Sequence, residues 1–598
     1  LAIEEPAMLA VFGVLTLTCL VNLAYVLHTF RTTVFLDARD PAAMAVSLIN
    51  LVAFAIAAAY GYARSGGPAE AVQAAGVEAA SLAARGEARF RMALKDWSAS
   101  FKLSPAPADT FASFPWTKLD TIAISALTVV AALLRFWHLG HPGEIVFDEV
   151  HFVGQARHYL HGEPFLDPHP PIAKMIIALG IALFGDYSSS WRLGNATLGT
   201  ILVAVTYLLG RRMFGSRLAA ALAAGFVACD GFFIVDSRIG CIDIVYLTFA
   251  AISYLLLFRL IQTPEARERR RTLVYLGIVL GLCLGSKLYV PAITFLLVAG
   301  FVAFTLLRPV TEAHSEPVST QMRLAMGGLI VMGSVSAIFY IASFLPHYYL
   351  GWWGGIEDLF QYYKGVVWYE KSVSTATHPY ASPWWSWPLM LRPVAYWQNF
   401  PPQGDVSTIW GAGNPLTWWA VIPAMTIMAV RASERPNVAR TFIVTGYLAY
   451  LAMWIPVGRI LFLYHYMPSV YLGYLALGAV LADFWRGESE FWESFALFLA
   501  LLPALIIGVG HIAFVLKPAI IPTQWRPYAG LPAVVILLFA YLVAFNFRRA
   551  DRLIFCVFVA LAMMAFIYFL PVWLGIPIAR DGYYARMWLE GAGLRNWI

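Results

Sequence analysis

The chain has 598 residues, of which 60% are hydrophobic and 13% are charged, and its formal net charge is +6. A soluble fold cannot bury that much apolar surface, so the composition excludes a soluble enzyme and predicts a membrane protein with many spans. The modest net charge gives no indication of a nucleic-acid partner.

Apolar runs long enough to cross a bilayer, roughly 20 residues each, recur from one end of the chain to the other. They predict an all-α polytopic membrane protein with about fifteen transmembrane helices. We place these helices at residues 8–29, 43–63, 119–138, 191–211, 217–235, 241–260, 272–286, 289–308, 324–345, 416–430, 440–457, 466–484, 494–515, 528–546 and 553–574.

Arginine residues gather in four of the connecting loops, at residues 211–217, 259–271, 431–440 and 548–552. With the spans above, all four clusters fall on one side of the membrane, and basic loops mark the cytoplasmic side. The loops at 139–190 and 346–415 and the C-terminus are then external.

This topology divides the chain into five segments. Long ordered loops in compact proteins are usually functional, which applies to the linker at 64–118 and to the external loop at 346–415. The predicted segments are a two-span N-terminal extension at 1–63, a cytoplasmic linker at 64–118, a membrane core at 119–345 with its first external loop at 139–190, an external aromatic-rich loop at 346–415, and a C-terminal membrane half at 416–598.

The first external loop carries two adjacent acids, Asp148 and Glu149. Ionisable groups at a bilayer are costly and usually functional. Apolar positions recur at helical spacing over 148–160, which predicts a helix lying in the interface. The prolines of "DPHPP" then favour an extended turn, and a second short apolar helix follows at 171–184. A carboxylate here can act as a base toward a lipid-borne substrate, although Asp148 would equally suit a helix N-cap.

The motifs of this loop continue in order along the chain. They are "FDEVHF" and "FLDPHPPIAK" in the loop, then "WRLGNATLGT" (191–200), "DSRIGCIDI" (236–244), "GSKLYV" (285–290), "THPYASPWWSWPLMLRPVAYW" (377–397), "GNPLTWW" (413–419) and "GRILFLYHYMPS" (458–469). From about residue 119 to 485 they resemble the protein O-mannosyltransferase family of polyprenyl-phosphate-sugar-dependent glycosyltransferases. The resemblance implies a GT-C type glycosyltransferase with interfacial helices in a catalytic first external loop.

The chain departs from the family pattern in two places. Eukaryotic members carry a large carbohydrate-related domain in the external loop, for which 346–415 is too short, as in bacterial members. Residues 1–118 have no counterpart, and the last three spans match poorly. The resemblance implies inverting transfer of mannose from polyprenyl-phosphate-mannose to Ser/Thr hydroxyls of exported proteins, at the external face of a bacterial cell membrane.

The resemblance assigns Asp148 the role of the base that takes the acceptor proton, with Glu149 beside it supporting or orienting the acceptor. The polyprenyl phosphate leaves already ionised, so it needs positive charge rather than a general acid. Snorkelling to lipid headgroups is the alternative for each cation. Arg135 could also pair with the carboxylates, and His465 could satisfy a backbone group. The candidates for binding the donor phosphate are Lys287, Arg459, Arg192, Arg135 and His465.

Aromatic faces suit sugar C–H surfaces, although interfacial anchoring explains external tryptophans equally well. Asp236, Arg238 and Asp243 share another external turn, where a salt bridge between helices is the alternative to a substrate role. For binding the acceptor or the sugar we single out Asp167, His169, His378, Trp384 and Trp385.

Metal binding is a further alternative for the first external loop. Asp148 and Glu149, with His151 and His169, offer ligands for a hard divalent cation. Their spacing matches no metal motif, and the resemblance requires no metal. The five cysteines lie in apolar segments without metal-ligand spacing. We therefore expect no metal ligand and no required cofactor.

Two rival functions stay open at this level. One keeps the donor class but changes the sugar, or uses a lipid or glycan acceptor, as in aminoarabinose transferases. The other is a transporter, which usually places ionisable groups near the midplane, often with inverted repeats. Here the acids gather at one face and no repeat is found. The expected partners are the donor, a Ser/Thr-containing protein and membrane lipids, with homo- or hetero-oligomers left open.

Overall fold

The computed structural model describes residues 115–165, 168–307, 318–490, 492–499 and 550–589. Several predictions fall outside these residues. They are the spans at 8–29, 43–63 and 528–546, most of the span at 494–515, and the linker up to residue 114.

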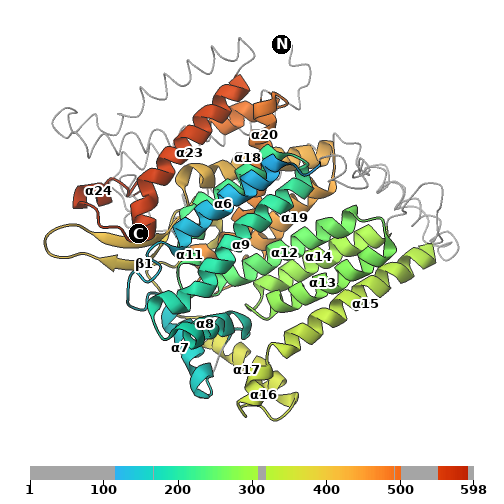
Figure 1. Cartoon of the computed structure of the whole chain (residues 1–598), viewed down its shortest axis with the longest axis vertical. Helices are drawn as coiled ribbons and strands as arrows, with labels where there is room; N and C mark the ends of the chain where they lie inside the picture. Colours follow the sequence, from blue (N-terminus) through green and yellow to red (C-terminus); the bar gives the residue numbers. More distant parts are fainter. Residues whose placement is uncertain (1–114, 166–167, 308–317, 491, 500–549, 590–598) are drawn as a thin grey trace.

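A bundle of long helices forms the main body of the molecule (Figure 1). Within the described residues, eight helices are long and apolar enough to cross a membrane, or nine if α10 and α11, which are bent by 59°, form one span. The predicted count of about fifteen is not confirmed. The bundle helices are α6 (Lys118–Phe136), α9 (Ser188–Phe214), α10 (Arg217–Cys229), α11 (Gly231–Ser237), α12 (Asp243–Gln262), α13 (Ala266–Leu284), α14 (Val290–Leu307), α15 (Val318–Ala342), α18 (Pro415–Glu434), α19 (Val438–Ala452), α20 (Met467–Arg486) and α23 (Ala550–Leu574).

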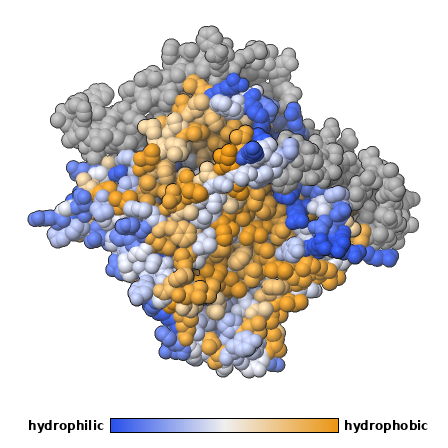
Figure 2. Space-filling view, viewed as in Figure 1, coloured by the Kyte–Doolittle hydropathy of each residue, from blue (hydrophilic) through white to orange (hydrophobic). Residues whose placement is uncertain are grey.

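The surface and the core both fit a membrane protein. Figure 2 shows an apolar surface across the middle of the bundle, with hydrophilic residues gathered toward the helix ends. Helix α20 is almost entirely buried. Gly478 contributes to this packing, because a Cβ there would lie 2.7 Å from the backbone oxygen of Ala219 on α10. Small residues let membrane helices approach closely.

The arginine clusters lie together at one end of the bundle, here called the arginine-rich end. Among the described residues, where Arg552 represents the last cluster, the clusters are linked directly or through the C-terminal end of α20, which confirms the prediction that they share one side. The linking pairs are Arg212–Gln262, Arg486–Ser216, Arg486–Asp483, Arg431–Asp483 and Arg552–Trp485.

Shorter elements gather away from the arginine-rich end. Helices α7 and α8 match the two predicted interfacial helices closely in position, as expected from their apolar spacing and from the prolines between them. The shorter elements are α7 (Glu149–His161), α8 (Ile172–Phe184), α16 (Leu345–Tyr349), α17 (Glu357–Ser372), the 3-10 helices η1 (Trp384–Ser386) and η2 (Leu463–Tyr466), and α24 (Arg580–Tyr584).

A short antiparallel hairpin, β1 (Val394–Asn399) and β2 (Ser407–Gly411), adds strands that the sequence patterns did not predict. Val394 pairs with Gly411, and the register shifts between Ala395 and Trp397. Bulges of this kind redirect a side chain. Here Tyr396 is 5% exposed. The hairpin thereby adds a ring to the region around the adjacent acids.

Candidate active site

Asp148 directly follows a strained residue. Phe147 has a φ of 45°, in the left-handed region that non-glycine residues rarely adopt. Its ring centroid lies 4.9 Å from that of Tyr396, 6.0 Å from that of Phe462 and 6.4 Å from that of Tyr464. Such strain persists only where the surroundings over-determine it. The aromatic packing around Phe147 therefore fixes the direction in which the side chain of Asp148 points.

The side chain of Asp148 does not cap a helix. The residue occupies the N-cap position of α7, but its side chain makes no capping hydrogen bond. The carboxylate instead accepts a hydrogen bond of 3.4 Å from the Tyr464 hydroxyl. The capping alternative is therefore wrong for this side chain, and the carboxylate is left for chemistry.

Burial raises the pKa of Asp148 from 3.8 to about 6. The negative charge of Asp243 acts in the same direction. The charges of His151 and Lys287 and the hydrogen bond from Tyr464 lower the pKa and partly offset this rise. The carboxylate is therefore ionised at neutral pH, yet more basic than an exposed aspartate. A pKa near the working pH suits a general base.

Lys287 lies in the turn between α13 and α14, and its side chain is 6% exposed. Its ammonium group contacts Asp243 Oδ1 at 2.5 Å and lies 5.4 and 5.3 Å from the ring centroids of Tyr246 and Tyr464. This burial argues against snorkelling to lipid headgroups. Because Tyr464 also contacts Asp148, one tyrosine joins the candidate base to the candidate phosphate-binding lysine.

Arg459 pairs with Glu370 of α17 at 3.0 Å, and its side chain is 21% exposed. Burial lowers the pKa of His169 well below 6.5, and the positive charges of Lys287 and Arg459 act in the same direction. Both cations therefore lie within electrostatic range of one histidine in the first external loop. Binding of the donor phosphate by these two cations stays a prediction.

Glu149 and Arg192 form a buried, bidentate ion pair. The two bonds measure 2.7 and 2.8 Å, and the side chains are 0% and 1% exposed. The carboxylate also accepts hydrogen bonds from the Trp191 indole and from the amides of Val146 and Gly240. The structure corrects two expectations: Glu149 has no oxygen turned toward an acceptor, and Arg192 has no access to a phosphate. Both instead position the loop that precedes α7.

Arg135 stabilises the break between α10 and α11 and is not placed to bind the sugar donor. Its guanidinium donates to the carbonyl oxygens of Val227 at 3.1 Å and Ala228 at 3.3 Å, where α10 ends and helical partners are lacking. Arg238 similarly donates to carbonyl oxygens at the end of α6, including that of Trp137 at 2.6 Å. The structure therefore corrects the phosphate role of Arg135 and its alternative pairing with the carboxylates.

Two histidines occupy the aromatic layer around the site. The Nδ1 atom of His465 lies 3.0 Å from the carbonyl oxygen of Phe462, so the backbone alternative accounts for this ring nitrogen, and phosphate binding by the ring stays a prediction. His378 packs edge-to-face on Phe462 at 5.1 Å and on Phe147 at 5.8 Å. The structure thus brings His378 next to the residues that orient the candidate base.

The remaining sugar or acceptor candidates stay predictions. Trp384 and Trp385 lie on η1 and pack partly against the hydrophobic core, which explains them without a sugar. The backbone carbonyl of His169 accepts a hydrogen bond from Lys174. Asp167 lies outside the described residues.

Sequence reasoning missed Tyr464 and Glu370. Tyr464 stands inside the motif "LFLYHY", where the neighbouring histidine drew the interpretation instead. No sequence signal singled out Glu370, which is one of several acids on α17. For Asp243 the alternative of a salt bridge is correct, but the partner is Lys287 rather than Arg238.

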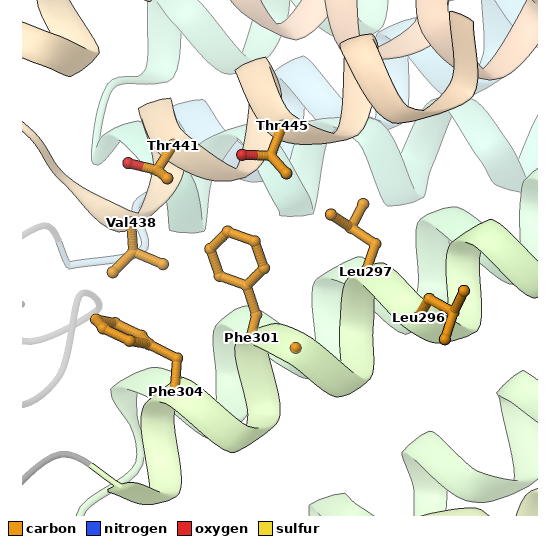
Figure 3. A pocket seen from close by; sticks show the side chains of 8 residues that line it. Leu296, Leu297, Phe301, Phe304, Val438, Thr441 and Thr445 are labelled. Atoms are coloured by element: carbon orange, nitrogen blue, oxygen red, sulfur yellow. The ribbon is translucent and has the colours of Figure 1, made fainter. Parts of the chain in front are cut away.

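Metal binding and the cavities of the molecule are the remaining alternatives for a site. In the described part of the chain, no group of three or more His, Cys, Asp or Glu side chains is placed to hold a metal ion. The expectation that no metal is needed stays a prediction. A cavity of about 250 Å³ lies between α14 and α19 and offers no acid or base for catalysis. Figure 3 shows the residues that line it, which are Leu296, Leu297, Gly300, Phe301, Phe304, Val438, Thr441 and Thr445.

Comparison with known proteins identifies relatives along most of the chain. Residues 125–350 match the family model for dolichyl-phosphate-mannose-protein mannosyltransferase. Residues 356–592 match the model for the C-terminal four-transmembrane region of protein O-mannosyltransferase. The polyprenol-phosphate-mannose–protein mannosyltransferase of Mycolicibacterium smegmatis is 25% identical over 81% of this chain and 96% of its own. The Mycobacterium tuberculosis protein of the same name is 23% identical over 81% and 95%.

A solved structure shares the fold. The chain resembles the Saccharomyces cerevisiae protein O-mannosyltransferase Pmt1–Pmt2 complex bound to the sugar donor, with a TM-score of 0.61 and 16% identity over 81% of this chain and 94% of that one. The predicted GT-C fold is confirmed by this likeness. With two adjoining family models and relatives along four-fifths of its length, the chain belongs to the dolichyl-phosphate-mannose-protein mannosyltransferase family.

Proposed function

We propose that this protein is an inverting glycosyltransferase that moves mannose from polyprenyl-phosphate-mannose to Ser/Thr hydroxyls of exported proteins. The family and the named activity of its bacterial relatives support the reaction. The observation that carries the mechanism is the placement of Asp148, an ionised and poorly exposed carboxylate, beside a tyrosine that also covers Lys287.

In the proposed reaction, Asp148 takes the proton of the acceptor hydroxyl as its oxygen attacks the anomeric carbon. The bond from that carbon to the phosphate oxygen breaks, and the electron pair leaves with the polyprenyl phosphate. Lys287 and Arg459 stabilise the developing negative charge in a poorly solvated site. Attack from the face opposite the phosphate inverts the anomeric centre. No general acid is required, because the leaving phosphate is already ionised.

The site is proposed to face outward in a bacterial cell membrane. Basic loops mark the cytoplasmic side of membrane proteins, and the arginine-rich end carries four such clusters. The loop that holds Asp148 emerges from the opposite end of α6. Exported proteins would meet the base there, while the donor's lipid chain stays in the bilayer.

The test is transfer of labelled mannose from polyprenyl-phosphate-mannose to a Ser/Thr peptide by the purified chain in detergent. We expect labelled peptide, and no loss of rate after treatment with a chelator, because Lys287 and Arg459 supply the positive charge. Label in a lipid or glycan acceptor instead would assign the rival acceptor class. Absence of transfer from any polyprenyl-phosphate sugar would overturn the proposal. Sedimentation of the same sample measures whether the chain self-associates. The question arises because the similar yeast structure is a complex of two chains.

A further inference from the structure

Asp236 on α11 is a buried carboxylate without a hydrogen-bond partner. The residue is 1% exposed, and neither carboxylate oxygen accepts a hydrogen bond. The amide of Ile244 lies near it but forms no hydrogen bond of normal geometry. An unpaired polar group costs free energy when buried, and a charged one costs more. Such exceptions are few in folded proteins and call for a specific explanation.

The surroundings of Asp236 place it between the candidate base, Asp148, and the candidate phosphate-binding lysine, Lys287. The chain that follows Asp236 contacts residues on both sides of the site. The Gly240 amide donates to Glu149, the neighbour of Asp148, at 2.7 Å, and Asp243 contacts Lys287 at 2.5 Å. The hydroxyl of Tyr246, whose ring lies under Lys287, is also buried without a partner. In an inverting transfer, the attacking oxygen and the leaving phosphate lie on opposite sides of the anomeric carbon. A residue on the segment that contacts both the neighbour of the base and the phosphate-binding lysine is therefore placed to lie beside the sugar ring.

We propose that Asp236 binds the sugar of the donor, its carboxylate accepting hydrogen bonds from hexose hydroxyl groups and so discriminating among sugars. This inference rests on the proposed donor class. A carboxylate only accepts hydrogen bonds, and sugar hydroxyls supply the donors that both oxygens of this buried group lack. The donor phosphate is not its partner, because like charges repel. The acceptor hydroxyl gives its proton to Asp148. A site built around a hydroxyl rejects analogues that lack it.

The experiment measures the affinity of the full chain in detergent for polyprenyl phosphate, polyprenyl-phosphate-mannose and its 3-, 4- and 6-deoxy forms. We expect Asp236→Asn to weaken binding of the mannosyl donor about 10- to 100-fold, the range for a hydrogen bond to a charged group. Affinity for bare polyprenyl phosphate should be unchanged, because this ligand carries no sugar hydroxyl. At least one deoxy donor should bind wild type more weakly by a similar factor, with no further loss in the variant.

Asp186→Asn is the matched control, because it makes the same change on an exposed ion pair with Arg157 and should leave every affinity unchanged. If Asp236→Asn cannot be purified, the deoxy donors still test the inference on the wild-type chain. Equal binding of all deoxy donors, or an undiminished preference for mannose in the variant, would overturn it. A wild-type chain that binds no polyprenyl-phosphate sugar would overturn the proposed function instead.

Discussion

At the scale of single residues, Asp148 combines burial with ionisation. Burial raises its pKa to about 6, while Tyr464 and Lys287 limit the rise. Because the folded-state pKa lies above the unfolded value, the stability that this carboxyl contributes is greatest below about pH 4 and is lost as the pH rises through 6. A more basic carboxylate is thereby obtained at some cost in folding stability at neutral pH.

The rate of transfer should fall as the pH drops through about 6, because the base becomes protonated. A profile of kcat/KM against pH should show this acid limb. Tyr464→Phe should move the limb to higher pH, since the hydroxyl stabilises the ionised carboxylate. Tyr349→Phe, on a ring that is 85% exposed, is the control and should leave the limb in place. An unmoved limb in Tyr464→Phe would show that the hydroxyl does not act on the base.

Glu149→Gln should lower stability as well as activity. Breaking a buried ion pair from one side leaves Arg192 uncompensated, which typically costs about 3–5 kcal/mol. The measurement is the thermal unfolding temperature in detergent. The control is Glu163→Gln, whose carboxylate is 60% exposed beside His158 and should cost less than about 1 kcal/mol. Equal unfolding temperatures in the two variants would contradict a positioning role for Glu149.

At the scale of single elements, α17 carries a carboxylate to a candidate phosphate-binding residue. Glu370 pairs with Arg459 at 3.0 Å, with both side chains only partly exposed. A donor phosphate would need the same guanidinium and would therefore compete with Glu370. Helix α17 is thus coupled to the donor site, although it follows the transmembrane helix α15 and contributes no catalytic group.

Glu370→Gln should raise the affinity for polyprenyl phosphate, by at most about fivefold, because a partly exposed ion pair is worth about 1 kcal/mol or less. Glu357→Gln, on the same helix, is the control and should leave the affinity unchanged. Binding of a labelled polyprenyl phosphate in detergent measures both. Weaker binding in Glu370→Gln would mean that Glu370 orients Arg459 rather than competing for it.

The elements differ in how far the sequence could predict them. Helices α7 and α8 follow from local signals, the apolar spacing and the prolines between them. The break between α10 and α11 does not, because it is stabilised by Arg135, which lies more than 90 residues away in the chain. The hairpin escaped prediction because its aromatic, half-buried strands resemble an interfacial loop in composition.

The site shows the same limit. The family resemblance located Asp148, Lys287 and Arg459 from their motifs, but a motif does not state which side chains meet. Arg192 was predicted to bind phosphate because it is a cation at a helix end. Only the fold shows that its guanidinium is paired with Glu149. Tyr464 became visible only when segments 316 residues apart came together.

At the scale of the whole molecule, charge is divided between two ends of an apolar bundle. The arginine clusters occupy one end, and Asp148, Lys287 and Arg459 follow the opposite ends of α6, α13 and α19. This division suits a transferase whose donor lies in the bilayer and whose acceptor arrives from one side. A transporter would instead carry its ionisable groups near the midplane.

The most direct measurement is the single-turnover rate at which Asp148→Asn transfers labelled mannose from polyprenyl-phosphate-mannose to a Ser/Thr peptide. The rate should fall about 10²- to 10⁴-fold, as for the loss of a general base. Donor binding should persist, and the unfolding temperature at neutral pH should be equal or higher, because an ionised carboxyl has been removed from a poorly solvated place. Asp186→Asn should transfer like wild type. Near-normal transfer by a well-folded Asp148→Asn would contradict the assignment of Asp148 as the base.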